Sequence, residues 1–225
     1  VFGIFPARTN QNDEIEIYNP SNNKLLNKFI CLRQQTIKTS NTPNLSICDY
    51  VSSDEKINDY AGCFAVSAGF GTDEFSKTFE DKNDDYNSIM VKAVADRLAE
   101  ATAEYLHERV RKDFWGYASD ENLNNNQLIA EKYKGIRPAP GYPACPDHLE
   151  KSVIWDLLDV KKNIGMKLTE SLAMWPASSV SGYYFSHPEA KYFGLGKIDN
   201  DQLEDYAKRR NISIELAKKW LNPII

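Results

Sequence analysis

The chain has 225 residues, of which 42% are hydrophobic and 26% are charged, and its formal net charge is −5. This length and composition fit a globular protein with one sizeable core, so we expect a single domain covering residues 1–225. The acidic balance argues against a nucleic-acid partner, and the lack of a long apolar run or signal peptide argues against a membrane partner, so we expect a cytoplasmic protein.

The first third of the chain has short apolar runs separated by turn residues, which is typical of β-strands. Strands are predicted at residues 1–6, 14–18, 24–32, 45–51 and 60–67, with a hairpin turn at 19–22. These strands predict a twisted, mainly antiparallel sheet. Because the chain begins inside an apolar run without Met, we also expect it to be an N-terminally truncated piece of a longer protein.

Residues 84–114 contain no Pro or Gly and predict one long central helix of roughly 45 Å. Apolar residues recur at spacings of three and four and predict its buried face: Val91, Val94, Leu98, Ala101 and Tyr105. The polar residues of the other side are expected at the surface: Asp96, Glu100, Glu104 and His107. The basic run at residues 109–112 is interpreted as a solvated helix face.

The rest of the chain alternates between helical and extended patterns. Short helices are predicted at residues 125–133 and 147–158, strands at 167–171, 180–185 and 191–197, and two final helices at 200–210 and 213–221. Ser213 is a good N-cap candidate for the last helix. The fold class is therefore predicted to be α+β, with one sheet, one long helix and several shorter helices.

The segment at residues 135–146, GIRPAPGYPACP, contains four Pro residues. Each Pro lacks an N–H group and fixes φ, so the segment predicts a stiff, shaped loop. Its unpaired backbone groups must face water, side chains or a ligand. The residue types leave two interpretations open: a connector with Arg137 in a surface ion pair, or a binding loop.

No metal site or nucleophilic centre is predicted. The cysteines lack CxxC spacing and are expected to be free thiols: Cys31, Cys48, Cys63 and Cys145. The histidines have no partner at metal-ligand spacing: His107, His148 and His187. The Gly-rich loop of Rossmann-type methyltransferases is also missing.

Three long segments carry a resemblance to a known family. They read RPAPGYPACPDH, DDYNSIMVKAVADRLAEATAEYLHERVRKDFWGYA and GMKLTESLAMWPASSVSGYYFSHPEAKYF. Over residues 1–221 the chain resembles the S-adenosylmethionine-binding reactivation domain of cobalamin-dependent methionine synthase, a multidomain methyltransferase. The resemblance implies that the domain supplies the methyl group for reductive methylation of inactive cob(II)alamin, which restores methionine synthesis from homocysteine.

The resemblance also implies partners: a neighbouring cobalamin-binding domain and a flavodoxin-like electron donor. It implies that Arg137 holds the methionyl carboxylate, a task that suits a planar guanidinium. The residues implied to bind the cofactor are Arg137, Ala139, Tyr142, Tyr192, Phe193, Glu100 and Glu131. Some relatives carry Tyr-Tyr where this chain has Tyr192-Phe193. The family's Asp for the cofactor amino group belongs to a segment before this chain, so we expect weakened affinity.

Two other functions remain open. The domain could sense S-adenosylmethionine and control docking without a direct role in methyl transfer, and the sequence does not separate this from the leading hypothesis. A free-standing enzyme acting through Cys145 or Glu131 is the third hypothesis. In the leading hypothesis no side chain of this chain is catalytic, because reduced cobalt is the nucleophile and the domain contributes orientation.

Overall fold

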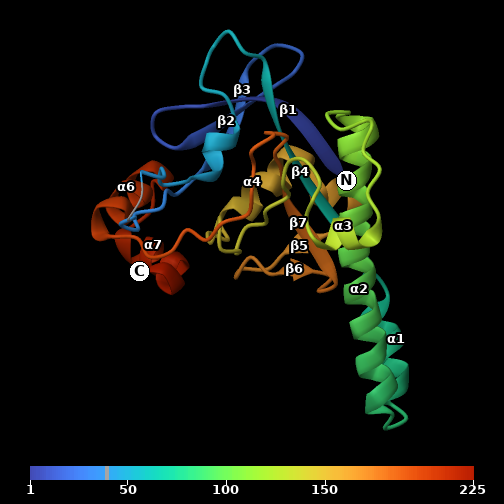
Figure 1. Ribbon diagram of the computed structural model, residues 1–225. Helices are drawn as coiled ribbons and strands as arrows, with labels where there is room; N and C mark the ends of the chain where they lie inside the picture. Colours follow the sequence, from blue (N-terminus) through green and yellow to red (C-terminus); the bar gives the residue numbers. More distant parts are fainter. Residues whose placement is uncertain (39–40) are drawn as a thin grey trace.

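The fold is described by a computed structural model for residues 1–38 and 41–225. Its centre is an antiparallel five-stranded sheet in the order β3-β2-β1-β4-β7 (Figure 1). The strands are β1 (Phe2–Thr9), β2 (Glu14–Tyr18), β3 (Leu25–Ile30), β4 (Asp59–Ser67) and β7 (Ser179–Tyr184). Strands β5 (Lys167–Leu168) and β6 (Met174–Trp175) form a separate two-stranded sheet. The predicted α+β class with a mainly antiparallel sheet is confirmed.

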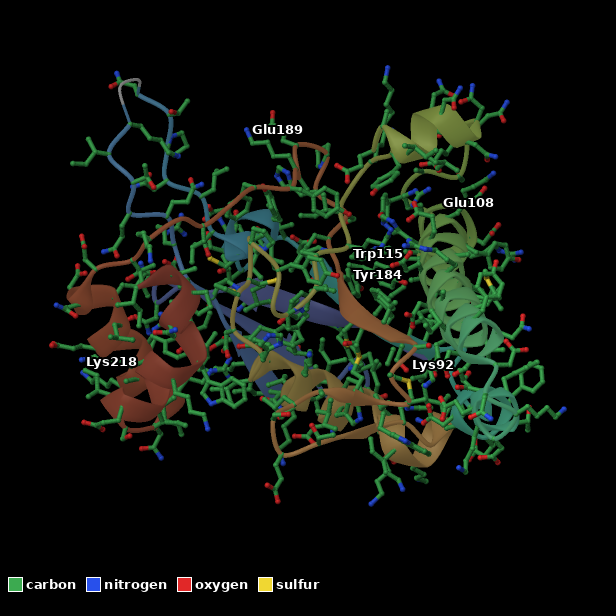
Figure 2. The ribbon with its side chains drawn as sticks, turned by 90° about the horizontal axis from the view of Figure 1, so that it is seen from below. Lys92, Glu108, Trp115, Tyr184, Glu189 and Lys218 are labelled. Carbon is green, nitrogen blue, oxygen red and sulfur yellow. The ribbon has the colours of Figure 1, made fainter. Side chains whose placement is uncertain are left out.

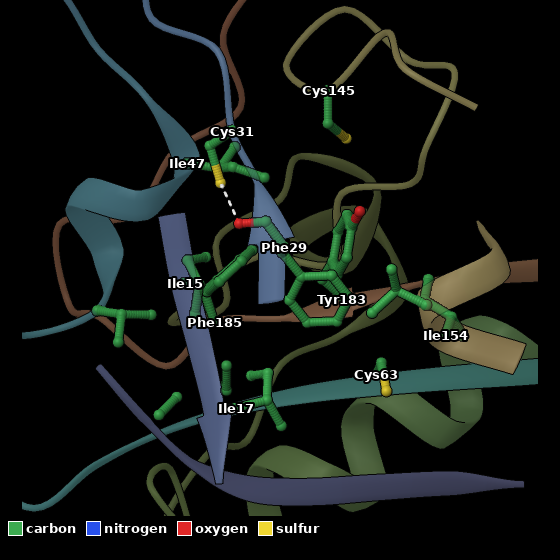
Figure 3. Close-up of a cluster of buried hydrophobic side chains, with 14 of the residues drawn as sticks. Ile15, Ile17, Phe29, Cys31, Ile47, Cys63, Cys145, Ile154, Tyr183 and Phe185 are labelled. Atoms are coloured by element: carbon green, nitrogen blue, oxygen red, sulfur yellow. Dashed lines mark hydrogen bonds between the residues drawn. The ribbon is translucent and has the colours of Figure 1, made fainter. Parts of the chain in front are cut away.

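Strand β4 is buried on both faces because its side chains alternate between two cores. Cys63 and Ala65 join the larger core, which lies between the sheet and α4 (Glu150–Leu158). In this core the rings of Phe29 and Tyr183 meet edge to face at 4.8 Å (Figure 3). Phe64 points the other way, towards the long helix. The sheet is therefore sandwiched between helices on its two faces.

The long helix is confirmed. Helix α2 (Asp85–Arg109) runs on through a π-helical turn, η2 (Val110–Phe114), and the Asp84 side chain caps it by accepting from the Asn87 N–H at 3.1 Å. Helix α1 (Thr72–Glu80) precedes it and was not predicted, because its sequence is almost entirely polar. Figure 1 shows α1 lying beside the first half of α2, and this pair extends beyond the sheet.

The predicted buried face of this helix is wrong. Val94, Leu98 and Tyr105 are 49%, 54% and 59% exposed. The buried side of this helix carries small and polar residues instead: Ser88, which bonds to Ser76 of α1, and Ala95, Ala99, Ala103 and His107. Small side chains allow the helix backbone to approach the sheet closely, and the aromatic rings that fill the interface come from the strands.

Two predicted strands are also wrong. Residues 45–51 form a short 3-10 helix, η1 (Ile47–Tyr50), because the Asp49 carboxylate accepts from the Ser46 N–H at 2.8 Å and folds the chain back. Residues 191–197 form an extended loop with no strand pairing. The Leu195 N–H donates to the Pro143 carbonyl at 2.8 Å, and Gly196 has a left-handed φ of 79° that interrupts a strand.

Several predicted elements are confirmed with shifted ends. Helix α3 (Asn125–Ile129) stops early because Glu131 adopts a left-handed φ of 53°. Helix α4 starts after residue 147 and is followed by α5 (Val160–Ile164), which was not predicted. Only two residues of the segment 167–171 form a strand.

The C-terminal helices form a second, smaller core at the far side of the molecule from α2, where Lys218 lies in Figure 2. They are α6 (Asn200–Arg210), α7 (Ile214–Leu221) and the short η3 (Asn222–Ile224). The Ser213 hydroxyl accepts from the Leu216 N–H at 3.2 Å, which confirms the predicted N-cap. Arg210 joins these helices to Glu150 of α4 and to Asp147 in the loop before it through ion pairs. Among the described residues, no helix is long and apolar enough to span a bilayer.

The orientation of α2 can be tested with two substitutions of opposite kind. Ala103→Leu should lower the free energy of unfolding by about 1–3 kcal/mol, because the buried site has no room for three more carbons. Leu98→Ala should change it by less than about 0.5 kcal/mol, because Leu98 is exposed. Urea denaturation measures both. A loss of several kcal/mol for Leu98→Ala would instead support the face predicted from the apolar spacing.

Candidate functional site

The Pro-rich loop at residues 135–146 is fixed to the open edge of β7. Ile136 and Phe185 exchange two backbone hydrogen bonds of 3.0 Å, and the Tyr183 N–H donates to the Pro138 carbonyl at 2.9 Å. Further along, the Gly141 N–H donates to the Cys145 carbonyl at 2.8 Å, which closes the loop on itself. The expected stiff, shaped loop is present, and its backbone groups bind the sheet edge as well as each other.

A cleft of about 1480 Å³ lies between this loop, α2, α3 and the segment around residue 192. All seven residues that the sequence assigned to cofactor binding line it: Arg137, Ala139, Tyr142, Tyr192, Phe193, Glu100 and Glu131. They come from segments nearly 100 residues apart, and the fold brings them to one site. Their role in ligand binding stays a prediction.

Arg137 is the positive centre of the cleft. Its Nη2 donates to the Glu104 carboxylate, and its backbone N–H donates to the Tyr192 hydroxyl at 3.1 Å. Burial works to lower the pKa of Arg137, but Glu104 and the hydroxyls of Tyr192 and Tyr133 outweigh it and raise that pKa. The guanidinium is therefore charged at any physiological pH.

The Tyr192 hydroxyl forms two hydrogen bonds within the site. Besides accepting from Arg137, this hydroxyl shares a hydrogen bond of 3.2 Å with the Tyr133 hydroxyl. Phe193 lines the cleft and also packs its ring edge-on against Tyr50, with centroids 6.4 Å apart. The chain thus retains the hydroxyl that fixes the Arg137 backbone, and the neighbouring position contributes a ring alone.

The two predicted acidic residues lie at the mouth of the cleft. Glu100 is exposed and pairs with Arg97 at 2.6 Å, and Glu131 is exposed at the end of α3. The sequence placed Glu100 at the surface by periodicity and at the site by resemblance, and the structure agrees with both. Asp96, one turn earlier on α2, accepts from the Ser178 hydroxyl at 2.6 Å and fixes the helix to the segment before β7.

Sequence reasoning missed a buried polar group behind Arg137. His107 is fully buried, its ring stacks on Tyr184 with centroids 5.4 Å apart, and neither ring nitrogen has a partner within the described residues. Arg111 was predicted to lie on a solvated face, yet it is fully buried and held by Glu121 at 2.6 Å. Its guanidinium also lies over the Tyr133 ring at 4.5 Å. Figure 2 shows Tyr184 and Trp115 between α2 and the sheet.

The spacing of small residues could have revealed this face. Ala95, Ala99 and Ala103 recur every four residues, and His107 continues the series. On one side of a helix this spacing marks close backbone packing, which places the fourth member of the series in the interior. The positions of the large apolar residues predicted the opposite face, because most of these side chains on α2 point away from the sheet.

Cys145 is poorly suited to act as a nucleophile. All four cysteines are free and buried, as predicted for free thiols. Burial and the nearby Asp147 raise the pKa of Cys145, whose Sγ donates to the Ala139 carbonyl at 2.9 Å. A protonated thiol bonded to the backbone disfavours the hypothesis of an enzyme acting through Cys145.

Two comparisons with known proteins find a matching family and a similar solved structure. The family model described as "Vitamin B12 dependent methionine synthase, activation domain" matches residues 1–211. A crystal structure described as the MetH reactivation domain bound to AdoHcy is similar to this chain, with a TM-score of 0.95 and 54% sequence identity. The match covers 100% of this chain and 69% of that chain.

The buried His107 predicts a specific response to acid. Burial, together with Arg111 and Arg137, lowers the pKa of His107 well below its ordinary value. The unfolded chain therefore takes up a proton that the folded chain resists, and the free energy of unfolding should fall below about pH 6.5, by up to about 1.4 kcal/mol per pH unit. His107→Phe should flatten this slope between pH 4.5 and 6.5 in urea titrations. The same substitution at the less buried His187 is the control, and equal slopes for His107→Phe and the unmodified chain would contradict the assignment.

Proposed function

Because the chain belongs to the activation-domain family of vitamin B12 dependent methionine synthase, we propose that it binds S-adenosylmethionine in the cleft around Arg137. The observation that carries this proposal is the convergence of seven residues, implied by the resemblance, on one cleft. The relative's bound AdoHcy differs from S-adenosylmethionine by the methyl group and its positive charge, which supports a ligand of this kind.

The charges of the cleft fit the ligand's methionyl end. Arg137 offers a guanidinium to a carboxylate, and such charge-assisted bonds are worth roughly 1.5–3 kcal/mol. Glu100 and Glu131 add negative charge to the lining of the cleft, which favours a ligand that carries an ammonium and a sulfonium.

The Pro-rich loop fits the adenosyl end. The Ala139 carbonyl already accepts from Tyr142 and Cys145, so its main-chain N–H is the group offered to the adenine edge, and Tyr142 has an exposed ring that can pack beside it. The loop is already fixed by its bonds to β7, so it loses little entropy when a ligand binds.

We propose that the bound ligand donates its methyl group to reduced cobalamin carried by a neighbouring domain, with one electron from a flavodoxin-like donor. The cleft volume of about 1480 Å³ is larger than the roughly 1,000 Å³ upper range of ordinary small-molecule pockets, which leaves space for a second reactant over the ligand. In this proposal the chain binds and orients the methyl donor and needs no general base. The methyltransferase activity belongs to the assembled enzyme, and this chain alone is not expected to turn over.

The alternative is a domain that binds the same ligand but only senses it and controls docking. Single-turnover methylation of reduced cobalamin on a separate cobalamin-binding domain distinguishes the two. We expect the methylation rate to rise when this chain is added with S-adenosylmethionine. An unchanged rate, with ligand binding intact, would favour the sensing function.

Arg137→Ala should weaken binding of S-adenosylmethionine about 10-fold to 100-fold, because the carboxylate loses its charged partner. The matched control is Arg97→Ala, which removes another arginine that lines the cleft but is exposed and paired with Glu100. The control should change affinity less than about twofold. Calorimetric titration measures both variants, and equal losses for the two would argue against a specific carboxylate site.

A further inference from the structure

The guanidinium of Arg137 is held by one side chain. Of its three nitrogens, Nη2 donates to Glu104, and Nε is buried without a partner within the described residues. Nη1 has no hydrogen bond to any described residue and does not belong to the buried unpaired atoms. The ion pair therefore leaves one donor nitrogen open at the wall of the cleft, which both residues line.

Glu104 is well placed to fix this geometry. It follows Ala103, which is fully buried against the sheet, so its backbone belongs to the most firmly packed part of α2. The pair is partly shielded, since the side chains of Arg137 and Glu104 are 24% and 33% exposed. An ion pair of this kind is screened less than a surface pair.

The other end of Arg137 is fixed independently. Its backbone N–H donates to the Tyr192 hydroxyl, which is bonded in turn to Tyr133. The main chain therefore stays in place when Glu104 is changed. The long side chain has many rotamers, however, and Glu104 is the one side chain among the described residues that forms an ion pair with the guanidinium.

We propose that Glu104 is a positioning residue that holds the Arg137 guanidinium with Nη1 directed to the cleft, and thereby makes the site selective for ligands with a free carboxylate. This inference rests on the proposed function and deepens it. Glu104 acts through Arg137, and the ligand's carboxylate shares the guanidinium with it. The opposite possibility is that Glu104 competes with the ligand for Arg137, and the two predict opposite changes in affinity.

The test compares two variants and two ligands by calorimetric titration. The ligands are S-adenosylhomocysteine and its carboxyl methyl ester, which lacks the negative charge. Glu104→Ala should weaken binding of S-adenosylhomocysteine about fivefold or more, because Arg137 loses its holder. Glu104→Gln should stay within about twofold of the unmodified chain, because its amide oxygen still accepts from Nη2. Neither variant should change binding of the ester.

A double-mutant cycle gives the second readout. In an Arg137→Ala background, Glu104→Ala should have no further effect on affinity. Tighter or unchanged binding of S-adenosylhomocysteine by Glu104→Ala would overturn the inference, and so would an equal loss for the ester. Undetectable binding by the unmodified chain would overturn the proposed function, whereas binding that ignores Glu104 would overturn only the positioning role.

Discussion

The close packing of α2 on the sheet is the constraint on which the rest of the structure depends. Ala103 packs with the rings of Phe64 and Tyr184, and Ala95 and Ala99 are buried on the same side of the helix. Close approach fixes the rotation of the helix as well as its distance. Glu100 and Glu104 lie on the same helix and line the cleft, so the packing of α2 on the sheet sets the positions of these two carboxylates.

The opposite wall depends on the edge of the same sheet. Strand β7 is the last strand, and an open edge leaves backbone groups that must find partners. The Pro-rich loop satisfies some of them through Ile136 and Pro138, so its position follows from the sheet. Helix α2 and the Pro-rich loop, which form the two walls of the cleft, both contact strand β7, and this strand sets the distance between them. The loop that forms one wall is therefore held by backbone hydrogen bonds to β7.

Much of the fold could be predicted from the sequence because its signals are local. The absence of Pro and Gly at residues 84–114 and the turn residues at 19–22 each depend on a few neighbouring residues. The predicted strand at 45–51 failed because a contact along the chain, from Ser46 to Asp49, competes with extended structure. The strand at 191–197 failed because its backbone binds Pro143 and Gln34, which are distant in sequence. Periodicity contains no information about either kind of partner.

The site shows the same division. Resemblance identified seven residues that line the cleft, and the role of Tyr192 as a cofactor contact stays a prediction. The structure adds a contact that the resemblance did not imply, because the Tyr192 hydroxyl accepts from the Arg137 backbone N–H. The sequence did not predict that Glu104, His107 and Arg111 lie in or near the interior, because charged and polar side chains are usually exposed. Each is retained in or near the interior by a specific neighbour: Arg137 for Glu104, Tyr184 for His107, and Glu121 for Arg111.

These buried groups give the cleft its electrostatic character. The buried Arg111 and the partly buried Arg137 are each paired with one glutamate, Arg111 with Glu121 and Arg137 with Glu104. His107 is held neutral by its surroundings and adds no charge. A free carboxylate entering the cleft therefore meets a guanidinium that is charged but already oriented. Because folding already orders the guanidinium, binding loses less free energy to ordering this side chain, and the affinity for the carboxylate is higher.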